Sequence, residues 1–106
     1  MLAIILEFDV IEGMESDFRQ AWAETTDIIY QNFGSLGSRL HKSEGGKFIA
    51  YAQWPDLNVY ESDHLWADDI HNARERMRAT LKTGKPTILH KLLVDIDLLK
   101  KRQIIN

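Results

Sequence analysis

The sequence predicts an α+β domain of the ferredoxin-like type, with the element order strand, helix, strand, strand, helix, strand. Strand-like and helix-period segments follow one another in this order, and paired glycines mark a tight hairpin between the second and third strands. A chain of 106 residues suffices for one such domain and is too short for two. We expect a single domain over residues 1–106, with its core over about 2–97 and a C-terminal tail over 98–106.

The first strand and the first helix are defined by a change of hydrophobic period. Residues 2–10 are apolar at nearly every position and then alternate, which predicts a central strand. Glycine breaks this pattern at position 13. An apolar stripe at spacings of four and three then predicts an amphipathic helix that ends near Gly34. The stripe consists of Phe18, Trp22, Thr25, Ile29 and Phe33.

The next two strands form a hairpin whose register is not fixed by the pattern alone. A two-residue turn at the paired glycines would set Arg39 opposite Ala52 and His41 opposite Ala50. Tyr51 would then lie on the opposite face of the sheet. A slip of one residue would bring Tyr51 to the same face as Arg39, so both registers stay open. The small alanines would leave space for a ligand or a helix.

The last helical region and the last strand complete the fold. Residues 56–81 are helical in pattern, but the apolar stripe changes phase near residues 67–69, which predicts two pieces with an aspartate capping the second. Residues 82–86 predict a loop, and residues 87–98 alternate as a long final strand.

The predicted sheet is apolar on both faces. Two helices cover only one face of a four-stranded antiparallel sheet, yet the first and last strands carry apolar side chains on the other face as well. We therefore expect a homodimer in which the sheets of two copies pack face to face.

The composition excludes several classes of function. The formal net charge of −3 gives no reason to expect a nucleic-acid partner, and we interpret the basic cluster at residues 74–78 as a solvated face. The absence of cysteine excludes disulfides, thiolate metal sites and a cysteine nucleophile. No segment has the features of a signal peptide or the roughly 20 apolar residues of a spanning helix, so we expect a cytoplasmic protein without a membrane partner.

Three segments carry a family resemblance: VIEGMESDFRQAW, NFGSLGSRLHK and FIAYAQWPDLNVYESDH. In this order of elements they resemble the antibiotic biosynthesis monooxygenase family over about residues 2–97. The resemblance implies a dimeric α+β barrel and a range of activities, among them cofactor-free oxygenation of phenols or quinols and haem degradation. The haem-degrading pattern implies an asparagine on the first strand and a tryptophan and histidine ten residues apart. Here Glu7 and Asp9 occupy that strand, and Arg74 stands ten beyond His64, so this activity is not expected.

The resemblance assigns roles to two aromatic residues. Trp54 resembles the family tryptophan at the end of the third strand, where an indole offers an apolar wall and a π-face to an aromatic substrate. It could instead be a core residue at the corner where the chain leaves the sheet. His64 resembles the family histidine, and histidine can accept a phenolic proton near neutral pH. Its alternative role is that of a structural, inward-facing residue.

The remaining candidates are basic or aromatic. His41 is a second candidate for the catalytic base, and Arg39 could bind an oxyanion or form an ion pair at a surface or interface. The candidate substrate-binding residues are Trp54, Arg39, Tyr51, Tyr60, Trp66 and Trp22, of which the helical aromatics could also be core. No phosphate loop, dinucleotide fingerprint or helical metal-ligand pair is present, so we expect neither a cofactor nor a metal.

Together these features predict a cofactor-independent monooxygenase for a small aromatic, quinol-type or polyketide-like substrate. Two alternatives stay open. One is a non-catalytic protein that binds a small ligand in the same pocket, and the other is an isomerase or cyclase that needs only acid–base groups.

Overall fold

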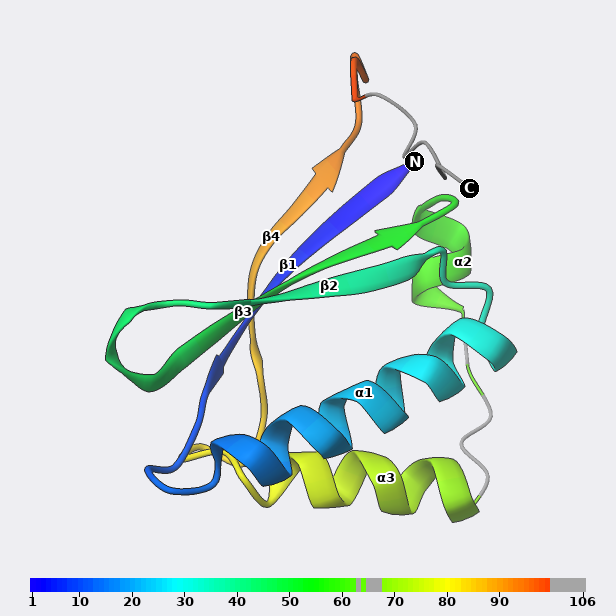
Figure 1. The fold of residues 1–106 in the computed structure, drawn as a ribbon. Helices are drawn as coiled ribbons and strands as arrows, with labels where there is room; N and C mark the ends of the chain where they lie inside the picture. Colours follow the sequence, from blue (N-terminus) through cyan, green and yellow to red (C-terminus); the bar gives the residue numbers. More distant parts are fainter. Residues whose placement is uncertain (63, 65–67, 100–106) are drawn as a thin grey trace, which may run out of the picture.

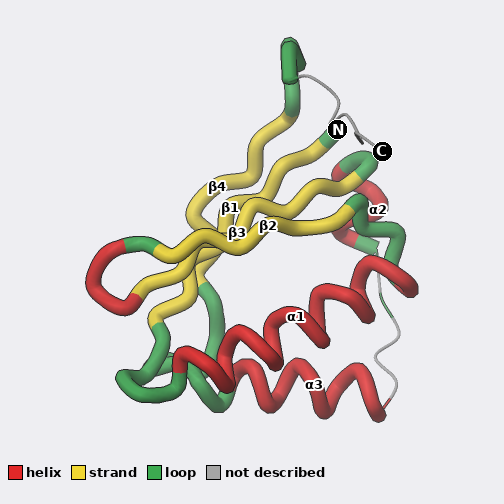
Figure 2. Tube along the Cα trace, viewed as in Figure 1, coloured by secondary structure: helices red, strands yellow, loops and turns green. Residues whose placement is uncertain are grey.

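The computed structural model describes residues 1–62, 64 and 68–99, and it has the α+β ferredoxin-like architecture that the sequence predicts. In chain order its elements are β1 (Leu2–Asp9), α1 (Glu15–Asn32), β2 (Gly37–Lys42), a 3-10 turn (Glu44–Gly46), β3 (Lys47–Trp54), α2 (Leu57–Glu61), α3 (Asp68–Arg78) and β4 (Thr87–Leu93). The strands form one antiparallel sheet in the order β2-β3-β1-β4. Helices α1 and α3 lie side by side on one face, and the short α2 lies at one end of the sheet (Figures 1 and 2). None of the described helices is long and apolar enough to cross a lipid bilayer.

The hairpin between β2 and β3 closes with three residues rather than two. The loop residues Glu44–Gly46 form a 3-10 turn in which both glycines have positive φ, a conformation that glycine adopts without steric cost. Across the loop, the Ser43 amide donates to the Lys47 carbonyl at 2.8 Å. The additional loop residue shifts the register of β2 against β3 by one position.

This register decides which face of the sheet each hairpin side chain occupies. Arg39 pairs with Tyr51, and His41 pairs with Ile49. All four belong to the face opposite the helices, because the alternate residues of β3 are the buried ones on the helix side. The two-residue register is therefore wrong, and the one-residue slip that the sequence left open is the arrangement found.

The final strand is shorter than predicted and carries a bulge. It ends at Leu93, which pairs with Leu2, and the Val94 amide makes the last hydrogen bond to β1, on the Met1 carbonyl at 2.9 Å. Beyond that point β1 offers no partner, so the alternating sequence alone does not sustain a strand. Leu89 is the extra residue of the bulge, which breaks the predicted alternation.

The region after β3 contains two separate helical pieces, as the phase change predicts, but the first ends at Glu61, before the expected break near residues 67–69. The side chain of the aspartate expected to cap the second piece lies outside the described part of the structure. The first is α2, and the second, α3, begins at Asp68. Asp56 caps α2, since its Oδ1 accepts a hydrogen bond from the Val59 amide at 2.8 Å.

The core consists of two clusters at opposite ends of the sheet–helix layer. One is built around Phe8, Phe18 and Phe48. The ring centroid of Phe18 lies 5.1 Å from that of Phe8 and 5.0 Å from that of Phe48. The other is built around Trp54 and Phe33. Phe18 is fully buried, so the predicted inward stripe of α1 is confirmed at this position.

We expect Phe18→Ala to lower the free energy of unfolding by about 3–5 kcal/mol, because it removes a buried ring between two others and leaves a cavity. Urea denaturation measures this change. Tyr30→Ala on the same helix is the matched control, since Tyr30 is 52% exposed and its loss should change stability by less than about 1 kcal/mol. Equal losses in the two variants would contradict this description of the core.

Candidate functional site

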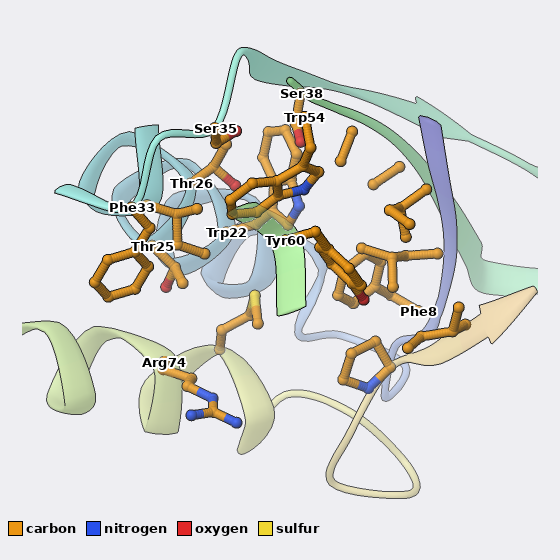
Figure 3. A pocket seen from close by; sticks show the side chains of 18 of the residues that line it. Phe8, Trp22, Thr25, Thr26, Phe33, Ser35, Ser38, Trp54, Tyr60 and Arg74 are labelled. Atoms are coloured by element: carbon orange, nitrogen blue, oxygen red, sulfur yellow. The ribbon is translucent and has the colours of Figure 1, made fainter. Parts of the chain in front are cut away.

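A cavity of about 400 Å³ lies between the sheet and helices α1 and α3 (Figure 3). This volume falls within the range of small-molecule sites. Every layer of the fold contributes to its wall: the strands supply aliphatic and aromatic residues, α1 supplies Trp22 and two threonines, and α3 supplies Met77 and two arginines. The wall is mainly apolar, with polar groups at a few positions.

Two small residues of β3 leave the space in which the cavity forms. Ala50 and Ala52 are buried and line it, and they lie between Phe48 and Trp54, which belong to the two core clusters. The large side chains at both ends keep the helices away from the sheet. The alanines cannot fill the gap that results.

Trp54 and His64 form one side of the cavity together with Phe33. The His64 ring stacks on both, with centroid distances of 4.5 Å to Phe33 and 5.8 Å to Trp54. Nε2 of His64 is buried and has no hydrogen-bond partner among the described residues. A buried imidazole nitrogen without a protein partner is available to a ligand that brings its own donor or acceptor.

Trp54 is a core residue that also lines the cavity. It is 7% exposed and packs in the core cluster with Leu2 and Phe33, and its ring also forms part of the cavity wall. Tyr60 stands edge-on against it, with a centroid distance of 5.4 Å. The indole is therefore held in place by packing on one side and presented to the cavity on the other.

Tyr60 adds a hydroxyl to the same wall. Burial, and then the negative charge of Glu61, raise the pKa of Tyr60 above its ordinary value. The phenol therefore stays protonated near neutral pH and can donate a hydrogen bond. Two further hydroxyls come from Thr26 of α1 and Ser38 of β2.

The basic cluster of α3 divides between the cavity and solvent, which corrects the interpretation of residues 74–78 as a wholly solvated face. Arg74 and Arg78 are half-buried and line the cavity, whereas Arg76 is exposed and pairs with Glu24 of α1 at 2.7 and 3.0 Å. Residues three or four apart share a helix face, whereas Arg76, two residues from Arg74, points elsewhere. Arg74 stands three residues before the inward-facing Met77 and Arg78 stands four residues after Arg74, and this spacing was the sequence signal that could have identified them.

The remaining candidates are divided by the register of the sheet. Trp22, Trp54, Tyr60 and His64 line the cavity. Arg39, His41 and Tyr51 lie on the opposite face and do not line it. Tyr51 is on that face as the sequence predicts, and the three-residue loop brings Arg39 and His41 to the same side, where Nδ1 of His41 lies 3.1 Å from the Ile49 carbonyl. Trp66 lies outside the described residues. Within the described part of the chain, no group of three or more His, Cys, Asp or Glu could hold a metal ion.

Solved structures share this fold across almost the whole chain. A candidate antibiotic biosynthesis monooxygenase from Bordetella bronchiseptica matches with a TM-score of 0.73 and 18% identity, covering 90% of this chain and 97% of that one. The chain has the fold of the antibiotic biosynthesis monooxygenases. SnoaB, a cofactor-independent oxygenase from Streptomyces nogalater, matches with a TM-score of 0.70 and 16% identity over 93% of this chain and 97% of that one.

A third structure, a candidate antibiotic biosynthesis monooxygenase from Deinococcus radiodurans, has a TM-score of 0.70 and 13% identity over 95% of this chain and 99% of that one. No protein-family model matches the sequence, and no curated protein matches it. At these identities the likeness establishes the fold, and the chemistry must be argued from the cavity.

We expect Tyr60 to ionise later than an ordinary tyrosine on titration into alkali. The folded state holds the phenolic proton of Tyr60 more tightly than the unfolded state does. The stability that this proton contributes is therefore complete below about pH 10, where an unfolded tyrosine ionises, and it is lost as the pH rises through the higher pKa of the folded state. Ultraviolet absorbance of tyrosinate measures the titration. The absorbance step that belongs to Tyr60 should be missing in Tyr60→Phe. It should persist in Tyr30→Phe, which changes an exposed tyrosine.

Proposed function

We propose that this protein is a cofactor-independent monooxygenase that binds a small aromatic hydroxy compound, of quinol or polyketide type, in the cavity between sheet and helices. The observation that carries the proposal is the stacked group of Trp54, His64 and Phe33, in which Nε2 of His64 is buried and has no hydrogen-bond partner in the part of the chain that the structure describes. The fold shared with SnoaB supports the same reaction class.

The first step would be removal of a proton. A flat substrate stacked on Trp54 would place its acidic O–H or C–H group beside His64, whose Nε2 accepts the proton. The Tyr60 hydroxyl would donate to the oxygen on which negative charge develops. Deprotonation makes the ring system electron-rich and therefore a reductant for O₂.

The following steps would use only substrate and oxygen. The carbanion transfers electrons to O₂ and a carbon–oxygen bond forms, and the resulting peroxide anion takes back the proton held by His64 to give a hydroperoxide. His64 would then accept the remaining C–H proton as the O–O bond breaks and pass it to the departing hydroxide, so that a CH₂ group and O₂ become a C=O group and H₂O. The apolar wall would keep bulk water from the intermediates.

Oxygen uptake with a panel of anthrones and quinols tests the proposal. We expect His64→Gln to lower kcat/KM by at least about a hundredfold near neutral pH, since it removes the base. The loss should shrink at high pH, where the substrate ionises by itself. His71→Gln is the matched control, because His71 is exposed on α3 and does not line the cavity.

Other outcomes would contradict the oxygenase. Binding of aromatic compounds without oxygen uptake would favour a non-catalytic binding protein. Turnover that continues under anaerobic conditions would favour an isomerase or cyclase. An unaltered kcat/KM in His64→Gln would show that His64 is not the base.

The open face of the sheet supports a homodimer as part of this proposal. Helices α1 and α3 lie on the other face, while Ile5, Ile49 and Tyr51 lie half-buried on this one and Leu92 is 47% exposed. Apolar side chains on a broad flat face lose contact with water when a second sheet packs on them. The partner would also cover Arg39 and His41.

We expect light scattering at micromolar concentration to give twice the 12.3 kDa of one chain. Ile5→Asp should shift the population to monomers, because it places a charge in the middle of the packed face. Tyr30→Asp on the exposed side of α1 should leave the mass unchanged. A monomeric parent protein would contradict the dimer.

A further inference from the structure

Three cationic side chains are among the described residues that line the cavity. Arg74 and Arg78 come from α3, and Lys85 comes from the loop before β4. Among the described residues that line the cavity, none is an aspartate or a glutamate. Since the whole chain carries a formal net charge of −3, this excess of positive charge is a local property of the cavity.

The two guanidinium groups are close enough to affect one another. Burial, and then the charge of Arg78, lower the pKa of Arg74. Nε of Arg78 is buried and has no hydrogen-bond partner among the described residues. Like charges one helical turn apart are destabilising, and a buried donor without an acceptor adds to that cost. An anion between the two arginines would offset both costs.

The two arginines and Trp54 line the cavity from different layers of the fold. Arg74 projects from α3, and Trp54 reaches the cavity from the sheet on the opposite side (Figure 3). Apolar and aromatic residues occupy most of the wall between them. A molecule that contacts both sides would combine a flat aromatic body with an anionic group at one end.

We propose that the cavity binds aromatic anions, with the ring system stacked on Trp54 and a carboxylate or phosphate group held by Arg74 and Arg78. Arginine suits this role because its planar fork of N–H donors matches both kinds of oxyanion. Lys85 is exposed at the rim and adds a third positive charge. The inference rests on the cavity of the proposed function and specifies the class of substrate that it accepts.

Binding of three related probes tests this inference: 2-naphthoate, 2-naphthyl phosphate and the neutral isostere 2-naphthamide. Titration calorimetry in the absence of oxygen measures binding alone. We expect at least one of the anions to bind about tenfold or more tightly than the amide, with a difference that shrinks at high salt. The tighter of the two anions identifies the carboxylate or the phosphate as the preferred group.

The variants Arg74→Gln and Arg78→Gln should each lower the affinity for the preferred anion by about tenfold and leave that for the amide unchanged. Arg76→Gln is the matched control, because the same substitution on the same helix removes only the surface pair with Glu24. Its affinities should equal those of the parent protein. Circular dichroism confirms that each variant is folded.

Equal affinity for the anions and the amide would overturn the inference, as would an equal loss in Arg76→Gln. A failure of this inference can be distinguished from a failure of the proposed oxygenase activity. Oxygen uptake with neutral phenols and no preference for anions would support the oxygenase and contradict the preference for anions. Selective binding of anions without any oxygen uptake would do the reverse.

Discussion

The cavity depends on one packing constraint in β3. Ala50 and Ala52 lie between two much larger side chains, Phe48 and Trp54, each anchored in its own cluster of buried residues. The aromatic residues at the two ends set the distance between sheet and helices, and the alanines are too short to bridge it. The space is therefore a consequence of close packing at both ends rather than of loose packing throughout.

The polarity of the cavity follows from the elements that surround it. The sheet contributes aliphatic side chains and Trp54, so this wall favours a flat apolar surface. Helix α3 contributes Arg74 and Arg78, which are half-buried and bring positive charge to this wall. Both features lie on the side of the sheet that the helices cover, and the proposal of an aromatic anion as ligand rests on this combination.

Two local irregularities decide which side chains lie on each face of the sheet. The three-residue hairpin loop sends Arg39 and His41 away from the cavity, and the bulge at Leu89 changes which residues of β4 face the helices. Ile88 thereby lines the cavity, whereas His90 pairs with Ile5 on the other face. The open face combines apolar side chains with charged and polar ones, among them Glu7, Arg39 and His41.

The sequence by itself determined the order of elements, the inward stripe of α1 around Phe18, the break before α3 and the place of Trp54 at the end of β3. These features depend on hydrophobic period and on residues adjacent in the chain, which can be read locally. Only the tertiary structure decided the hairpin register and the inward position of Arg74 and Arg78. One loop residue moves every side chain of a strand to the other face, and an arginine is polar at its tip but apolar along its stem. Whether such a side chain lies in solvent or lines a cavity depends on the elements that pack around it, and these come from distant parts of the chain.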